Sequence, residues 1–201
     1  MMRLTANALT CQRGGRIVFA GLSFAVASGE AVQVTGPNGA GKSSLLRLIA
    51  GLVRIEAGRL ALDGGDDEAT IGEQSHYCGH QDAFKASLTV SENLAFWTDY
   101  LGGGGCEAGT ALGRLGIDHL ADLPAGYLSA GQRRRLALAR LLTVHRPVWL
   151  LDEPTAALDL ASQKVLAGIM AEHVAGGGII LAATHGPLGL PTRELAIGRA
   201  S

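Results

Sequence analysis

The sequence predicts an α/β fold whose core is a mostly parallel β-sheet. Residues 31–36, 146–152 and 178–184 are apolar at nearly every position and have the length of strands. Such runs are typical of a parallel sheet, because helices cover both of its faces. Segments with helical spacing alternate with these runs, as the connections between parallel strands require. A chain of 201 residues is long enough to bury a substantial core in one domain.

The segments near the N-terminus differ from these runs, because their apolar and polar residues alternate. They are RLTANALT (residues 3–10), LSFAVA (22–27) and RLALDG (59–64). Alternation with a period of two is the pattern of strands that bury one face. We expect these segments to form an antiparallel sheet beside the core sheet.

Four segments carry a helical spacing of apolar residues: 42–52, 89–101, 129–144 and 161–174. A mostly helical insert is therefore expected between about residue 85 and residue 145. The acidic segment 63–73 and the glycine-rich segment 102–109 are expected to be loops. We expect one domain over residues 1–201, with the helical subdomain inserted into it.

Charge and composition exclude several classes of protein. A net charge of −1 gives no reason to expect a nucleic-acid partner. No apolar run approaches the roughly 18–20 residues that span a bilayer, and the N-terminus lacks the apolar core of a signal peptide. Cys11, Cys78 and Cys106 are widely spaced and odd in number, so we expect reduced thiols and no disulfide framework.

The strongest motif is GPNGAGKSS at residues 36–44, which matches the phosphate-binding pattern G-x-x-x-x-G-K-[ST]. It follows an apolar strand and opens a helix, so glycine backbone N–H groups and the helix N-terminus converge on phosphate oxygens. Lys42 is expected to reach the β- and γ-phosphates, and the Ser43 hydroxyl to bind Mg²⁺. The loop residues expected to contact the nucleotide are Gly36, Pro37, Asn38, Gly39, Ala40, Gly41, Lys42, Ser43 and Ser44. The sequence therefore predicts a nucleoside triphosphate site.

Polar residues at the ends of two further core strands are candidates for the chemistry. Residues 148–152 end in Asp152, which is placed to hold Mg²⁺ through water. Glu153 adds a second carboxylate, which favours a base that polarises an attacking water. His185 follows the strand of residues 178–184, at the edge where open α/β sheets bind their ligands.

The segment LSAGQRRRLALARLL at residues 128–142 begins a helix with unusual charge. Ser129 and Gln132 fit a capping box. Arg133, Arg134 and Arg135 lie in or beside the first turn, where the helix dipole disfavours cations. Two interpretations remain open: a solvated basic face, or a helix end built to meet an anion.

The segment HYCGH offers a possible metal site in His76, Cys78 and His80. On a strand these alternate residues would share one face. A closed metal site needs a fourth ligand, and no residue with suitable spacing supplies one. We expect this segment to be structural and to lead into the loop that carries Gln81.

Six motifs occur along the chain in the order GPNGAGKS, Gln81, LSAGQ, VWLLDEP, AALD and Thr184–His185. Together they resemble the nucleotide-binding domain of the ABC ATPases over residues of about 4–198. The resemblance implies a P-loop NTPase fold of the ABC ATPase type. It implies ATP and Mg²⁺ as cofactors and ATP hydrolysis coupled to transport.

The resemblance also implies roles outside the phosphate loop. Gln81 would contact Mg²⁺ and water and link the site to a membrane partner, and His185 would contact the γ-phosphate. Asp159 would lie in the D-loop. The signature motif, which binds the ATP of the opposite protomer, would comprise Ser129, Ala130, Gly131 and Gln132.

The partners implied by the resemblance are a second copy of the chain and integral membrane subunits. Two ATP molecules would lie between the two copies, so the anion that meets the arginine-rich helix would belong to the neighbouring chain. No nucleic acid and no insertion of this chain into the bilayer are expected. The implied location is peripheral, on the cytoplasmic face of a bacterial inner membrane.

One position departs from the family pattern. The family usually places an aromatic residue against the adenine ring, and here the matching segment LTCQRGGRIVF has Arg13 at that position. Two interpretations remain open, a guanidinium that stacks on the base and a solvated turn residue.

Three longer segments narrow the resemblance. LTCQRGGRIVFAGLSF, GHQDAFKASLTVSENLAFW and LSAGQRRRLALARLL are similar to the ATP-binding subunits of bacterial haem exporters for cytochrome c maturation. An exporter of another substrate is the alternative. An ABC protein of DNA maintenance would require a long coiled coil or a basic groove, and the sequence indicates neither. A P-loop kinase or GTPase would leave LSAGQ and His185 without a role.

Overall fold

The computed structural model describes residues 1–198 and contains two sheets. The antiparallel sheet has the order β2-β1-β4 and consists of β1 (Arg3–Arg13), β2 (Arg16–Ala27) and β4 (Ala57–Asp63). The parallel sheet has the order β5-β6-β7-β3-β8 and consists of β3 (Ala31–Thr35), β5 (Ser75–Cys78), β6 (Val148–Asp152), β7 (Ile179–Ala183) and β8 (Arg193–Ala196). The predicted α/β fold with a parallel core sheet and an N-terminal antiparallel sheet is confirmed.

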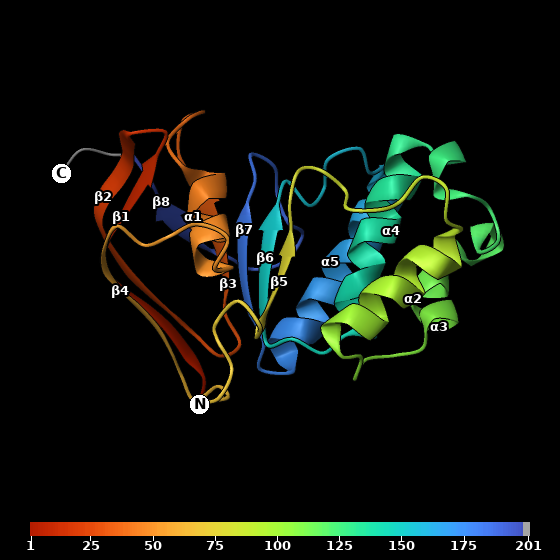
Figure 1. Ribbon diagram of the computed structural model, residues 1–201, viewed down its shortest axis with the longest axis horizontal. Coiled ribbons are helices and arrows are strands. Elements are labelled where there is room, and N and C mark those ends of the chain that lie inside the picture. The colour runs from red at the N-terminus through yellow and green to blue at the C-terminus, as the bar shows by residue number, and fades with distance from the viewer. Residues whose placement is uncertain (199–201) are drawn as a thin grey trace.

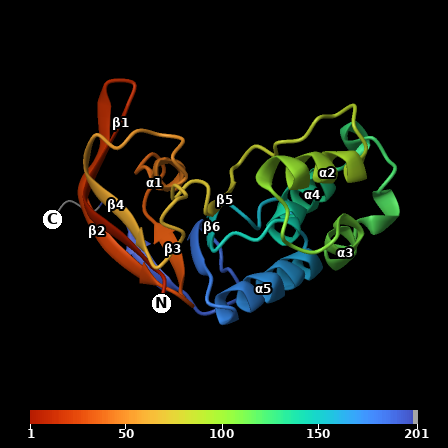
Figure 2. The same ribbon diagram turned by 60° about the horizontal axis from the view of Figure 1, so that its bottom comes forward.

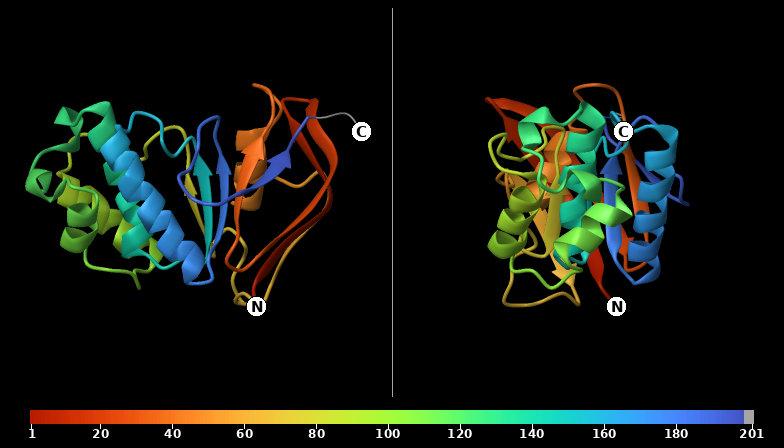
Figure 3. Two further views of the ribbon diagram at one scale, coloured as in Figure 1. Left: turned by 180° about the vertical axis from the view of Figure 1, so that it is seen from behind. Right: turned by 90° about the vertical axis from the view of Figure 1, so that its right-hand side faces the viewer.

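The helices pack in two layers. They are α1 (Lys42–Ile49), α2 (Val90–Leu101), α3 (Ala108–Arg114), α4 (Ala130–Thr143) and α5 (Leu160–Ala175), with short 3₁₀ helices η1 (Asp118–Leu120) and η2 (Ala125–Tyr127). Helix α1 lies between the two sheets, and α5, α4, α2 and α3 lie beyond the other face of the parallel sheet (Figure 1). The antiparallel sheet curves around α1 (Figure 2), and α5 runs beside the parallel strands (Figure 3).

The continuous apolar runs belong to strands that are buried on both faces. Along β6, Val148 and Leu150 pack with the core around α1, whereas Trp149 and Leu151 pack with the core around α4 and α5. Alternate residues of a strand point to opposite faces, so both faces of this strand must be apolar. This arrangement brings the ends of β3, β6 and β7 to one edge, beneath the loops that carry the predicted site.

All four predicted helices form, with one notable change of length. Helix α1 ends at Ile49 instead of residue 52, because Gly51 takes a left-handed conformation with φ of 72°. Helices α2, α3, α4, η1 and η2 lie within residues 90–143, inside the region of about 85–145 where the helical insert is expected.

Two elements form that the sequence patterns did not indicate, α3 and β8. Within residues 1–198 no helix is long and apolar enough to cross a membrane.

Candidate nucleotide-binding site

The phosphate-binding loop connects β3 to α1, and two of its glycines are sterically required. Gly36 has a φ of 141°, and a Cβ there would collide with the carbonyl oxygen of Ile197. Gly41 has a φ of 102°, and a Cβ there would lie 2.5 Å from a methyl carbon of Val18. Both backbone conformations are accessible mainly to glycine. The loop therefore takes its shape from glycines packed against β2 and the segment after β8.

Lys42 and Ser43 lie at the start of α1, where the helix N-terminus faces the loop. The ammonium of Lys42 donates hydrogen bonds to the carbonyl oxygens of Gly36 at 2.7 Å and Pro37 at 3.2 Å. The hydroxyl of Ser43 donates to Oδ1 of Asp152 at 3.0 Å. Asp152 is only 4% exposed. A hydroxyl and a carboxylate held together in this way are oxygen donors of the kind that Mg²⁺ prefers.

Glu153 lies one residue beyond β6 in a left-handed conformation, with φ of 47°. Its backbone N–H donates to the carbonyl oxygen of Ala183 at 2.8 Å, which ties the ends of β6 and β7 together. Thr184 Oγ1 donates to Oε2 of the carboxylate at 3.1 Å. From the same end of β7, Nε2 of His185 lies 3.2 Å from Oδ1 of Asn38 in the phosphate-binding loop.

These groups line a cavity of about 440 Å³, which we call the nucleotide cavity. Ten residues that the sequence predicts for the site line this cavity. They are Arg13, Asn38, Gly39, Gly41, Lys42, Ser43, Ser44, Asp152, Glu153 and His185. Val18, Arg47 and His80 also line it, and sequence reasoning gave them no role in nucleotide binding. In the sequence His80 is a candidate only for the metal site of the segment HYCGH, and it directly precedes Gln81.

Gln81 lies outside the lining of the nucleotide cavity. It lines a neighbouring cavity of about 310 Å³ together with Leu52, Trp97, Leu101 and Arg140, which we call the α2 groove. The indole N–H of Trp97 donates to the carbonyl oxygen of Ala83 at 2.8 Å. Because Gln81 does not line the nucleotide cavity, its contact with Mg²⁺, which the resemblance implies, stays a prediction.

The signature residues begin α4, and Ser129 is its N-cap with the expected capping box. The hydroxyl of Ser129 accepts a hydrogen bond from the Gln132 N–H at 3.2 Å, and Gln132 Oε1 accepts one from the Ser129 N–H at 2.8 Å. Asp159 caps α5, and its carboxylate accepts a hydrogen bond from the Ser162 N–H at 2.7 Å, which lowers the pKa of Asp159. Ser129, Ala130, Gly131, Gln132 and Asp159 do not line the nucleotide cavity of their own chain.

Arg134 and Arg135 of α4 donate hydrogen bonds within the molecule. Arg134 is 4% exposed, and its guanidinium donates to the carbonyl oxygens of Gly79 at 2.8 Å, Asp152 at 2.7 Å and Glu153 at 2.9 Å. Arg135 donates to the carbonyl oxygens of Leu115 and Gly116, each at 3.2 Å. Neither open interpretation of the basic triplet describes Arg134, because its charge is balanced by backbone dipoles and Asp82 within the fold.

His76, Cys78 and His80 do not form one cluster. Nε2 of buried His76 lies 2.8 Å from the carbonyl oxygen of Val144, and burial lowers the pKa of His76 to about 4. Strand β5 ends at Cys78, so His80 belongs to the following loop and is exposed. Among residues 1–198 no group of three or more His, Cys, Asp or Glu residues is arranged to hold a metal. Cys11, Cys78 and Cys106 are free thiols.

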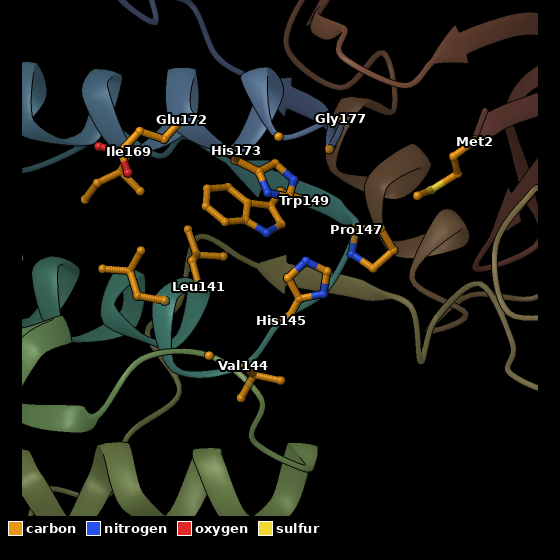
Figure 4. Close-up of a pocket in the computed structure, with 14 residues that line it drawn as sticks. Met2, Leu141, Val144, His145, Pro147, Trp149, Ile169, Glu172, His173 and Gly177 are labelled. Atoms are coloured by element: carbon orange, nitrogen blue, oxygen red, sulfur yellow. The ribbon is translucent and has the colours of Figure 1, made fainter.

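A third cavity, of about 350 Å³, lies at the opposite end of the parallel strands, where β6 and β7 begin (Figure 4). In it the imidazole of His173 stacks on the indole of Trp149, with ring centroids 3.8 Å apart and planes inclined by 10°. A Cβ on Gly178 would overlap the imidazole, so the ring is enclosed from that side too. Burial lowers the pKa of His173 to about 4.

Residues 19–156 match the sequence model of the ABC transporter family. The chain is 64% identical over 200 residues to the cytochrome c biogenesis ATP-binding export protein CcmA of Nitrobacter winogradskyi, with 100% of each chain covered. It is 60% identical over 197 residues to the protein of the same name from Bradyrhizobium diazoefficiens, with 98% of each chain covered.

Two solved structures are similar in fold. One is an ATP-binding subunit of an ABC transporter, with a TM-score of 0.79 and 25% identity over 90% of this chain and 79% of that chain. The other is a bacterial Atm1-family ABC exporter with ATP bound, with a TM-score of 0.81 and 26% identity over 98% of this chain and 37% of that chain.

Proposed function

We propose that this chain, which belongs to the ABC transporter family, is the ATP-hydrolysing subunit of a membrane transporter that serves cytochrome c biogenesis. The observation that carries the proposal is the group of Ser43, Asp152 and Glu153 beside the phosphate-binding loop. The oxygen atoms of Ser43 and Asp152 lie 3.0 Å apart and suit the metal ion of a metal-bound triphosphate. The carboxylate of Glu153 suits a base for the water that attacks the triphosphate.

Each of these residues has a distinct proposed role in hydrolysis. The ammonium of Lys42 and the loop N–H groups bind the phosphates. Ser43, and Asp152 through water, would hold Mg²⁺, whose charge would offset that of the phosphate oxygens. Thr184 holds Oε2 of Glu153 by its hydrogen bond, which leaves Oε1 to accept a proton from the attacking water. His185 is proposed to contact the γ-phosphate, which its distance of 3.2 Å from Asn38 in the phosphate-binding loop supports.

The proposed active unit is a dimer with two ATP molecules between the copies. Ser129 lies exposed at the N-terminus of α4 and outside the nucleotide cavity of its own chain. The N–H groups of such a helix end suit a phosphate bound by a partner chain. Asp159 is likewise exposed at the N-terminus of α5. These positions support the proposed signature and D-loop contacts across a dimer.

The α2 groove is the surface that we propose for the membrane subunits. Leu52 is 63% exposed, and on α2 Phe96 is 47% and Tyr100 72% exposed. Large apolar side chains gathered around a groove are typical of protein–protein contacts. Gln81 lines this groove beside the nucleotide cavity, which supports its proposed role as a link between the two. The chain would then be peripheral, on the cytoplasmic face of the inner membrane.

Haem is the proposed cargo, on the basis of the relatives named as cytochrome c biogenesis export proteins. Another exported substrate is the alternative, since cargo contacts in a transporter are made mainly by its membrane subunits. Purification of the chain from membranes with its partner subunits, followed by measurement of haem-stimulated ATPase activity, distinguishes the two.

The first test of the ATPase proposal is Glu153→Gln. The change removes the base and preserves the shape of the side chain, so hydrolysis should fall by about 10²–10⁴-fold while ATP binding is retained. Because ATP is not consumed, two chains should stay associated in ATP and separate in ADP. Steady-state turnover and size-exclusion chromatography measure both effects. Near-normal turnover of the variant would contradict the assignment.

A further inference from the structure

The nucleotide cavity contains a histidine to which the sequence assigned no role in nucleotide binding, His80. The next residue, Gln81, lines the α2 groove instead. In this backbone conformation the loop after β5 therefore presents its histidine, and not its glutamine, to the nucleotide.

The position of His80 follows from the order of the strands. In the parallel sheet β5 and β7 lie on either side of β6. Glu153 follows the end of β6 directly, His185 lies two residues beyond the end of β7, and His80 lies two residues beyond the end of β5. The two imidazoles thus enter the same cavity from the strands that flank the strand of the proposed base.

The loop that carries His80 is fixed to the loop of Glu153 by one buried side chain. Arg134 donates to the carbonyl oxygen of Gly79 at 2.8 Å and to that of Glu153 at 2.9 Å. It also donates to the carboxylate of Asp82 at 3.1 Å. His80 is therefore flanked by residues anchored to the same guanidinium, so its distance from Glu153 is set by the fold.

The chemistry of an imidazole in this cavity favours contact with phosphate. Mg²⁺ takes oxygen ligands, and Ser43 and Asp152 provide them, so a histidine nitrogen is not required at the metal. An imidazole N–H is a good donor to a charged phosphate oxygen.

We infer that His80 donates a hydrogen bond to the terminal phosphate of bound ATP, on the side opposite His185. The inference rests on the proposed ATPase function and extends it. A residue with this contact contributes to the binding of a triphosphate and not to that of a diphosphate, so His80 contributes to the discrimination of ATP from ADP.

The test compares the affinities of the full-length chain for a non-hydrolysable ATP analogue, AMPPNP, and for ADP, both with Mg²⁺. His80→Ala should weaken AMPPNP binding about five- to tenfold, as expected for the loss of a hydrogen bond to a charged group, and change ADP binding by less than about twofold. His80→Gln keeps an N–H donor of similar reach and should restore most of the difference. His119→Ala removes an exposed histidine of η1 and is the matched control.

Three outcomes would overturn the inference. The first is an equal loss of affinity for AMPPNP and ADP in His80→Ala. The second is an AMPPNP affinity of His80→Ala that equals that of the His119→Ala control. The third is a selective loss of AMPPNP affinity in Gln81→Ala and not in His80→Ala. Failure of the unmodified chain to bind either nucleotide would instead contradict the proposed function, and the inference with it.

Discussion

Arg134 shows how a single side chain can have a role that its sequence context hides. Its guanidinium donates to five oxygen atoms, which belong to Gly79, Asp82, Asp152, Glu153 and Pro154. Arginine suits this position because its planar fork offers donors in fixed directions. In the sequence it is the middle member of a basic triplet, and nothing in the helical pattern distinguishes it from its neighbours.

Replacement of Arg134 should therefore destabilise the fold. Arg134→Ala leaves a carboxylate and several buried carbonyl groups without donors, and we expect a loss of about 3–5 kcal/mol in the free energy of unfolding. Arg133→Ala, at a partly exposed position of the same helix turn, should change it by less than about 0.5 kcal/mol. Urea unfolding midpoints of both variants measure the difference, and equal midpoints would show that the buried hydrogen bonds add no stability.

Arg13 lines the nucleotide cavity together with Val18, and the resemblance to the family implies an aromatic residue at the position of Arg13. Stacking on a base that is partly exposed to water should contribute about 0.5–1 kcal/mol, so Arg13→Ala should weaken ATP binding about two- to fivefold. Because stacking tolerates either purine, GTP binding should weaken similarly.

Arg16 pairs with Arg13 across the hairpin and does not line the cavity, so Arg16→Ala is the matched control. Titration of both nucleotides against both variants decides the question. Unchanged ATP affinity in Arg13→Ala would identify Arg13 as a surface residue.

The proximity of the phosphate-binding loop to the polar residues at the strand ends could be predicted, because their chemistry is encoded within short contiguous segments, and their roles in catalysis and binding stay predictions. The contributions of His80, Val18 and Arg47 to the cavity could not be predicted, because these residues come from the loop after β5, from β2 and from α1, and no nucleotide-binding pattern in the sequence singles them out. The cavity that Gln81 lines could not be predicted either, since it depends on the backbone conformation between Gly79 and Asp82, which are both held by Arg134.

At the scale of elements, strong periodicity and capping gave correct strands and helices, whereas α3 and β8 were missed for physical reasons. Helix α3 contains Gly109 and Gly113 among its seven residues, and it is supported by the burial of Ala111 and Leu112. Strand β8 lies at the edge of the parallel sheet, and its side chains are mostly exposed, so it lacks the apolar run of the central strands. Both elements form because of tertiary packing, which a local sequence pattern does not contain.

Helix α4 provides the test of the proposed dimer. Ser129→Arg should abolish hydrolysis with little change in the ATP affinity of the isolated chain, because Ser129 lies outside its own nucleotide cavity. A mixture of Ser129→Arg and Lys42→Ala chains should form dimers that contain one intact composite site. We expect nucleotide-dependent association of that mixture, measured by light scattering, and none for Lys42→Ala alone. Loss of ATP binding by the Ser129→Arg monomer would mean that the helix serves its own site.

At the scale of the whole molecule, the two ends of the parallel strands differ in chemistry. Charged and polar groups of the nucleotide cavity gather where β6 and β7 end, whereas neutral histidines are enclosed near where the strands begin. His76 contacts the carbonyl oxygen of Val144, and His173 stacks on Trp149. Burial favours the uncharged imidazole at both positions.

These histidines should make stability depend on pH. In the folded chain the pKa of each is about 4, below the unfolded value of 6.5, so the unfolded chain binds protons first as the pH falls. Stability should be fully present above pH 6.5 and decline towards pH 4, by about 1.4 kcal/mol per pH unit for each histidine. His173→Phe keeps a ring on Trp149 and removes one titration, so it should reduce the slope by about that amount.

Urea unfolding at several pH values between 4 and 6.5 measures the slope, with His119→Phe as the exposed control. A slope in His173→Phe equal to that of the unmodified chain would contradict the prediction.

The position of β3 in the sheet determines how late in biosynthesis its partner strands become available. Val32 of β3 pairs with Leu181 on one side and Arg193 on the other, and Gly36 packs against Ile197. Translation at about 5–20 residues per second separates these partners by on the order of ten seconds. Throughout that interval the nascent strand has neither neighbour, and its apolar edge is available to chaperones. Nearly the whole polypeptide must therefore be synthesised before β3 has both of its neighbours and the phosphate-binding loop has its packing partner.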